Sequence, residues 1–173
     1  MRKTMGIAAV LGAAWLGGAC ARGADAPATA KATLEPRSGS TVMGTATFTE
    51  LPQGGVRAVI HIEKAPPGTH GLHIHEKGDC SAPDATSAGG HFNPTAMPHA
   101  GPMDAQHHAG DLGNIEIKAD GTGDLTITSK MLTVKAGPNS VVGRAVIFHE
   151  KADDLKTQPT GNAGGRLACG VVQ

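Results

Sequence analysis

Residues 42–63, VMGTATFTELPQGGVRAVIHIE, contain two segments of alternating apolar and polar residues on either side of a glycine-containing turn. A period of two is typical of a β-strand that buries one face. The second segment shows it most clearly, because one face carries Val56, Ala58, Ile60 and Ile62. The intervening LPQGG at 51–55 turns the chain back. This stretch therefore predicts two successive half-buried strands.

The same signals recur along the chain, and no segment has a convincing helical pattern. Asp120 and Gly121 form a strong two-residue hairpin signal. Further strands are expected at 30–35, at 70–75, from 115, around Leu125 and Ile127, at 141–149 and at 166–172. Long loops are expected at 76–111 and 150–165. The sequence thus predicts an all-β fold, an eight-stranded Greek-key β-barrel or sandwich with two long functional loops.

Length and charge limit the function classes. The chain has 173 residues, which is enough for one domain with a hydrophobic core. Its formal net charge is zero, so nothing indicates nucleic acid or an acidic membrane surface as a partner. Glycine and proline are abundant and aromatic residues are few, which favours a β-domain with many turns.

The N-terminal segment has the layout of a secretory signal peptide. Arg2 and Lys3 precede an apolar run that is too short for a transmembrane anchor. Cleavage after Ala21 would remove residues 1–21. Alternatively, Leu16–Cys20 (LGGAC) resembles a lipoprotein signal that would leave Cys20 lipidated. Both alternatives predict export, with 22–29 as a flexible tether and 30–173 as the folded domain.

Two cysteines remain beyond the signal segment. In an oxidising compartment, Cys80 and Cys169 are expected to pair. The alternative is two buried free thiols, which is less expected in an exported chain.

Metal-ligand residue types gather on two strands and one loop. His73 and His75 are two residues apart on an expected strand, so they project from one face. The other candidates are His91, His99, His108, Asp111 and His149. Three histidines and one carboxylate make a closed zinc set, whereas histidines alone suit copper. These seven candidates are one short of two four-ligand sites, a gap that one imidazole could close by bridging two ions.

Five motifs carry a specific resemblance. They are Gly71–Glu76 (GLHIHE), Gly90–Pro94 (GHFNP), His108–Asn114 (HAGDLGN), His149–Leu155 (HEKADDL) and Gly161–Gly170 (GNAGGRLACG). In this order they resemble the copper–zinc superoxide dismutases, from about Lys31 to the C-terminus. The long segment between Cys80 and His91 is similar to that of exported bacterial members of the family.

The resemblance implies a role for each motif residue. The implied copper ligands are His73, His75, His91 and His149, and the implied zinc ligands are His91, His99, His108 and Asp111. His91 would be the bridging ligand, and Cys80–Cys169 the family's disulfide. Arg166 would attract and orient the anionic substrate, so that Arg166 and His91 are the catalytic residues. Asp153 would link His73 to His99.

Three other histidines are interpreted without a metal. His107 is excluded because the HAGD register places Asp111 three residues after His108. His70 is expected to pack or hydrogen-bond within the fold, and His61 to lie on the surface. The pair Gln158–Pro159 stands where animal members carry a lysine near the substrate channel, so substrate steering here is expected to differ.

The resemblance implies a periplasmic oxidoreductase. Its substrate would be superoxide, converted to O₂ and H₂O₂ by alternate reduction and reoxidation of copper bridged to zinc through His91. The protein would be a monomer or homodimer, with membrane contact only through a lipid at Cys20. The alternative is an exported copper- or zinc-binding protein, a buffer or chaperone-like protein on the same fold. A zinc hydrolase is disfavoured, because the sequence offers no general base at an open zinc position.

Overall fold

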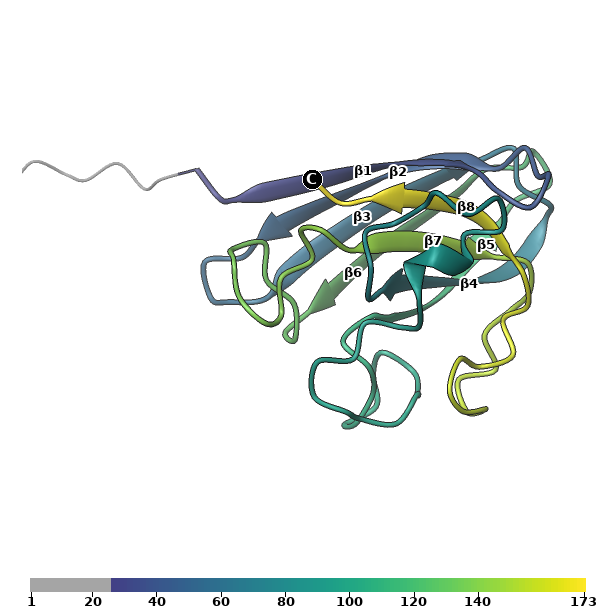
Figure 1. Cartoon of the computed structure of the whole chain (residues 1–173). Helices are drawn as coiled ribbons and strands as arrows, with labels where there is room; N and C mark the ends of the chain where they lie inside the picture. Colours follow the sequence, from purple (N-terminus) through teal and green to yellow (C-terminus); the bar gives the residue numbers. More distant parts are fainter. Residues whose placement is uncertain (1–25) are drawn as a thin grey trace, which may run out of the picture.

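Eight β-strands form the framework of the computed structural model, which describes residues 26–173 (Figure 1). The predicted signal peptide, Cys20 and tether residues 22–25 lie outside the described residues. The strands are β1 (Thr29–Pro36), β2 (Met43–Glu50), β3 (Val56–Glu63), β4 (Gly68–His75), β5 (Asp111–Ile117), β6 (Gly123–Ser129), β7 (Ala145–His149) and β8 (Arg166–Val171). Within residues 26–173, the helical structure is one 3₁₀ turn at Thr86–Ala88, so no described helix could cross a membrane.

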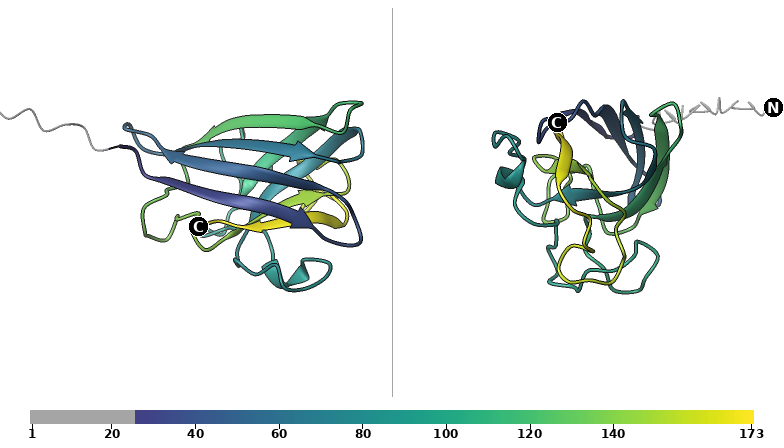
Figure 2. Two further views of the ribbon diagram at one scale, coloured as in Figure 1. Left: turned by 90° about the horizontal axis from the view of Figure 1, so that it is seen from above. Right: turned by 90° about the vertical axis from the view of Figure 1, so that its right-hand side faces the viewer.

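The strands form one sheet in the order β5-β4-β7-β8-β1-β2-β3-β6, and neighbouring strands are antiparallel. The crossings from β3 to β4 and from β6 to β7 give the Greek-key connectivity. Figure 2 shows the sheet rolled into a barrel that is nearly closed where β5 and β6 lie together. The predicted all-β Greek-key barrel is confirmed.

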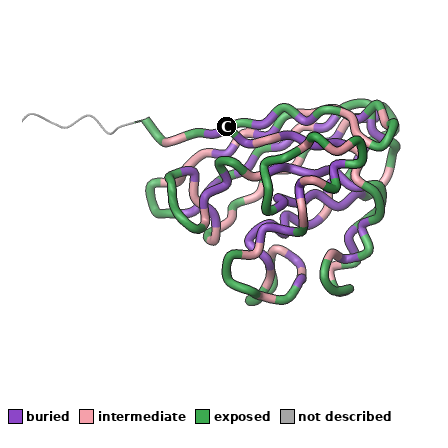
Figure 3. Tube along the Cα trace, in the orientation of Figure 1, coloured by how far each residue is buried: buried purple, intermediate pink, exposed green. Residues whose placement is uncertain are grey.

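The barrel interior is filled by the apolar faces of the strands. In β3 the residues alternate as predicted, with Val56, Ala58, Ile60 and Ile62 buried and Arg57 and Glu63 exposed. Phe48 on β2 and Leu34 on β1 are both fully buried in the same core cluster. Figure 3 shows the resulting alternation of buried and exposed positions along the strands.

Strands β4 and β7 depart from this alternation because both of their faces are covered. Leu72 and Ile74 of β4 belong to the barrel core, whereas His73 and His75, which project from the other face, are also fully buried. The loops after β4 and β7 cover that face from outside, as the two lower extensions in Figure 1 show. A layer of buried polar side chains therefore lies between the barrel and the loops.

Two strands begin about four residues away from the predicted position, whereas the other boundaries differ by at most about two residues. Strand β7 begins at Ala145 and not at Val141, because the chain turns at Gly143, whose φ is +78°. The turn is closed by a hydrogen bond from the Arg144 amide to the Val141 carbonyl. Asp111, expected at the end of the loop, is the first residue of β5, so its position is fixed by the sheet.

A disulfide joins the covering loop to the barrel. Cys80 and Cys169 are bonded, as predicted, across a sequence separation of 89 residues. Cys169 lies on β8, so the bond fixes the first part of the long loop to the last strand. In the chain-entropy model, closing a loop of this length stabilises the fold by about 4–5 kcal/mol.

The packing of β2 leads to a stability prediction. Replacing Phe48, which is fully buried, by Ala should lower the free energy of unfolding by about 3–5 kcal/mol, because it removes core contacts and leaves a cavity. Chemical denaturation of the metal-free protein measures this value. The matched control is Val59→Ala on the exposed face of β3, expected within about 0.5 kcal/mol of the parent. Equal losses in both variants would contradict this description of the core.

Candidate metal centre

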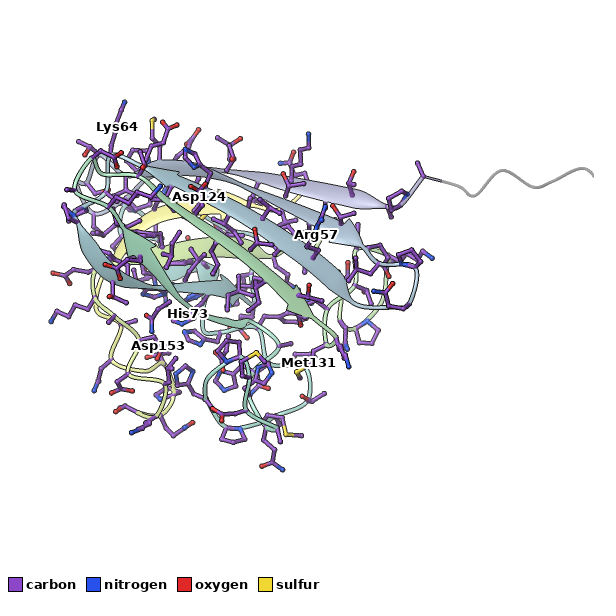
Figure 4. All side chains as sticks on the ribbon, turned by 180° about the vertical axis from the view of Figure 1, so that it is seen from behind. Arg57, Lys64, His73, Asp124, Met131 and Asp153 are labelled. Atoms are coloured by element: carbon purple, nitrogen blue, oxygen red, sulfur yellow. A yellow bond between two sulfur atoms is a disulfide. The ribbon has the colours of Figure 1, made fainter. Side chains whose placement is uncertain are left out.

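The candidate ligands come together from three strands and one loop. His73 and His75 lie on β4, His149 ends β7, and Asp111 begins β5. The loop supplies His91, which forms an isolated β-bridge with His75, and also His99 and His108. The loop between β4 and β5 is called the first loop, and the loop between β7 and β8 the second loop. Figure 4 shows His73 beneath the barrel, facing Asp153 in the second loop. All seven ligand candidates are buried.

The first cluster contains only imidazoles. Ligand atoms of His73, His75, His91 and His149 lie within 4.8 Å of one another. The Nε2 atoms of His75 and His149 are 3.3 Å apart. The His75 ring is oriented by its Nδ1–H, which donates to the Gly89 carbonyl at 2.9 Å. Imidazole nitrogens that converge in this way are a ligand set for copper or a similar divalent ion.

The second cluster is arranged around one carboxylate oxygen. The Nδ1 atoms of His91, His99 and His108 lie 2.8, 3.1 and 3.3 Å from Oδ1 of Asp111. The other oxygen of Asp111 accepts hydrogen bonds from the backbone amides of Ala100 and His108. Three imidazoles and one carboxylate form the closed, four-ligand set typical of zinc.

His91 is shared by the two clusters. Its Nδ1 faces Asp111 at 2.8 Å in the second cluster. Its ring lies 4.0 Å from the His73 ring and 5.1 Å from the His75 ring, between centroids. Its Nε2 is buried and has no hydrogen-bond partner. The two nitrogens of one ring thus serve different clusters.

Unpartnered nitrogens indicate that a cation fits the first cluster. Within residues 26–173, the buried side-chain nitrogens or oxygens without a partner are His73 Nδ1, His91 Nε2 and His149 Nδ1. All three belong to the four-histidine cluster. His149 turns its Nε2 toward His75, so its Nδ1 lies on the other side of the ring. Because buried polar atoms are normally paired, the free nitrogens of His73 and His91 are explained by a bound ion that accepts their lone pairs.

Asp153 connects the two clusters from the second loop. Its buried carboxylate accepts hydrogen bonds from Nε2 of His73 at 2.8 Å and from Nε2 of His99 at 2.9 Å. The Asn114 side chain bonds the backbone of Asp153 on both sides, so β5 holds this residue. Gly161 is required beside it, because a Cβ there would overlap the Asp153 carboxylate and lie 2.6 Å from His99 Nε2. This arrangement fixes both imidazole orientations.

Arg166 is fixed by the disulfide-anchored loop. Its guanidinium donates to the carbonyls of Ala85 and Gly89, each at 2.7 Å. The Gly89 carbonyl also accepts the hydrogen bond from His75, so the cation is tied to the first cluster. Arg166 is partly exposed and stays protonated at physiological pH, so it presents a fixed positive charge.

Sequence reasoning did not predict the contact that Gln158 makes at this site. The side-chain amide of Gln158 accepts from the His99 backbone amide at 2.8 Å and donates to the His99 carbonyl at 2.7 Å. A residue of the second loop therefore holds the main chain of a residue in the first. No sequence pattern indicates this pairing, since the partners are 59 residues apart.

The remaining predicted histidines lie outside both clusters. His70 is buried, its ring nitrogens lie within hydrogen-bond distance of the His149 and Pro66 carbonyls, and it stacks on Phe148. His61 lies on the outer barrel face, where its side chain is 40% exposed and pairs with Asp124. His107 donates from Nδ1 to the His108 carbonyl at 2.7 Å and is absent from both clusters.

Burial keeps the rings of His73, His75 and His149 neutral. It lowers the pKa of His73 and His75 well below the usual value, and that of His149 to about 3. The positive charge of Arg166 acts in the same direction on the pKa of His75 and of His149. Neutral imidazoles are the form that binds metal ions.

These shifts predict how acid affects the metal-free protein. Between pH 6.5 and about 3, His149 binds a proton in the unfolded protein but not in the folded protein. The contribution of His149 to the free energy of unfolding is therefore fully present above pH 6.5 and decreases as the pH falls. The loss is about 1.4 kcal/mol per pH unit for one such group. Denaturation of chelator-treated protein between pH 7 and 4 measures it, and His149→Gln should reduce the slope. An unfolding free energy independent of pH would contradict the prediction.

Comparison with known proteins agrees with this geometry. A family model described as copper/zinc superoxide dismutase matches residues 42–172. The fold is also similar to the crystal structure of the clock protein EA4, with a TM-score of 0.76 and 41% sequence identity, over 87% of this chain and 96% of that chain. The family binds copper and zinc, and both clusters could hold metal ions. Because the family match covers more than half of the chain, the protein belongs to the copper/zinc superoxide dismutase family.

Proposed function

We propose that this protein is a superoxide dismutase, which converts two superoxide anions and two protons into O₂ and H₂O₂. One observation carries the proposal: the His91 ring is shared by an all-histidine cluster and a histidine–aspartate cluster, with the Arg166 cation tied to the former through Gly89. A redox-active metal beside a fixed positive charge is what disproportionation of a small anion requires.

The two clusters differ in the ion that each would hold. His73, His75, His91 and His149 would hold copper, because histidines alone suit the ion with the highest divalent affinity. His91, His99, His108 and Asp111 would hold zinc. When bound, copper supplies the one-electron chemistry by alternating between Cu²⁺ and Cu⁺, whereas zinc has no redox role.

Arg166 would capture and orient the substrate. Superoxide carries one negative charge, and a fixed cation raises its concentration at the site. The hydrogen bonds to Ala85 and Gly89 hold the guanidinium, so little conformational entropy is lost when the anion arrives. The Cys80–Cys169 bond anchors the loop that supplies both carbonyls.

His91 would also supply a proton. Its Nδ1 is directed to Asp111 within the zinc set, so Nε2 would hold and release a proton next to the substrate whenever copper does not occupy it. Peroxide formation consumes two protons, so a proton held at Nε2 provides one and solvent the other. Asp153 keeps the neighbouring His73 and His99 rings in place through the cycle.

The proposed location is the periplasm of a bacterium. Two features support it: the signal-like sequence at 1–21, with Cys20 as the alternative lipid attachment, and the disulfide within the folded domain. Disulfides persist in exported proteins and are rare in the cytosol.

A second candidate is a copper- and zinc-binding protein without turnover. This candidate is supported by the similarity to the clock protein EA4, which has the same fold at 41% sequence identity and is not named as a dismutase. The two candidates differ in whether bound copper consumes superoxide repeatedly or is only stored.

Metal analysis with a superoxide-consumption assay tests the proposal. The mature protein loaded with both metals should consume superoxide catalytically. His149→Ala should remove copper, keep zinc, and lower activity more than about 100-fold, since even outer-shell changes at metal sites cost 10–100-fold. The matched control is His61→Ala on the exposed barrel face, which should leave both metals and activity unchanged. A copper-loaded protein no more active than free copper would overturn the proposal.

Removing the positive charge of Arg166 tests its role in attracting the substrate. Arg166→Gln should lower kcat/KM about tenfold or more and weaken its dependence on salt, because steering by a fixed charge is lost. Arg166→Lys should recover part of the rate. Arg57→Gln, on the outer face of β3, is the control that should keep the parent's rate and salt dependence. An Arg166→Gln variant as fast as the parent protein would refute steering by this residue.

A further inference from the structure

A second group of metal-binding side chains lies outside the two clusters. A cavity of about 360 Å³ lies between the long loop and the chain that follows β6. Met103 and His107 from the loop and Met131 after β6 all line it. Asp111 forms part of its inner wall, so the cavity lies against the zinc set. Figure 4 shows Met131 between the end of β6 and the loop that carries the histidines.

The two methionines bring thioether side chains to the cavity from two separate segments of the chain. Met131 is partly buried and packs against the barrel core, so its backbone position is set by the fold. Met103 is 91% exposed, so its side chain is free to change rotamer. Methionine is unbranched with three rotatable bonds, which lets an exposed thioether reach across a cavity.

His107 has one nitrogen fixed and the other available. Its Nδ1–H donates to the His108 carbonyl at 2.7 Å, which leaves the Nε2 lone pair free. A backbone carbonyl that fixes the tautomer and orientation of a ring in this way is typical of metal-binding histidines. His107 therefore provides a nitrogen donor at a cavity that already carries two sulfurs.

The charges at the cavity favour a monovalent ion. Asp104 and Lys130 also line it, and their opposite charges offset each other. The carboxylate oxygens of Asp111, the third charged residue of the lining, face the histidines of the second cluster and two backbone amides. The donor side chains Met103, Met131 and His107 are neutral. Thioethers are soft ligands that select Cu(I), whereas zinc prefers thiolate, imidazole and carboxylate ligands. A set of two sulfurs and one nitrogen with little net charge suits Cu(I).

We infer that Met103, Met131 and His107 form a separate Cu(I)-binding site at the outer wall of the metal centre. The site uses the histidine that neither cluster contains. The inference does not rest on the proposed dismutase activity, because it concerns metal binding at different residues.

Cu(I) titration of the full, metal-loaded protein tests the site. With both clusters filled, the protein should bind one further equivalent of Cu(I) without oxygen, in competition with bathocuproine disulfonate. The double substitution Met103→Leu and Met131→Leu conserves volume and should weaken this binding at least about tenfold. His107→Gln should also weaken it, and should leave the zinc content unchanged. X-ray absorption of the added copper should show sulfur neighbours in the parent protein.

The matched control is Met97→Leu, in the same loop but outside the cavity lining. This variant should bind the additional Cu(I) as tightly as the parent. The inference is overturned if the metal-loaded parent binds no further Cu(I), or if the double variant binds it as tightly as Met97→Leu does. A metal-loaded parent protein that binds the additional Cu(I) but does not consume superoxide would count against the proposed function alone. Failure of the Cu(I) site and failure of the proposed function are therefore distinguishable.

Discussion

The metal centre depends on the two hydrogen bonds that the Asp153 carboxylate accepts. One oxygen accepts from His73 and the other from His99, so a single residue orients a ring in each cluster. Both imidazoles are fully buried, where an unpaired N–H would be costly. The contact also unites the parts of the molecule, since His73 belongs to the barrel, His99 to the first loop and Asp153 to the second. Without it, both rings could turn and neither ligand set would be preorganised.

A second chain of contacts links stability to substrate binding. The disulfide fixes the start of the first loop to β8, the strand that begins with Arg166. Ala85 and Gly89 in that loop then accept hydrogen bonds from the Arg166 guanidinium, and Gly89 also accepts one from His75. The same loop therefore positions a cation and a metal ligand. This sharing explains how an irregular segment can hold two functional side chains in place.

Local patterns were sufficient to predict the barrel and to select the ligand candidates. The alternation in β3 and the i, i+2 spacing of His73 and His75 depend on neighbours in sequence, so both can be read from the chain. The start of β7 could not be predicted, because Val141 and Val142 look like strand residues and the turn at Gly143 decides against them. The contacts of Gln158 could not be predicted for a different reason. Its contacts are with the backbone of His99, and a side chain that binds backbone leaves no pattern in the partner's sequence.

The contact of Gln158 with His99 has a consequence for how the protein opens. Because this amide occupies both main-chain groups of His99, the first loop cannot detach there without breaking the second loop's contacts. Asp153 and Asn114 extend the same coupling to β5. The loops then behave as one cooperative unit, in which local opening exposes many backbone amides together. Individual residues of the second cluster would not detach one at a time, and the outer face of β4 and β7 would remain covered until the whole unit opens.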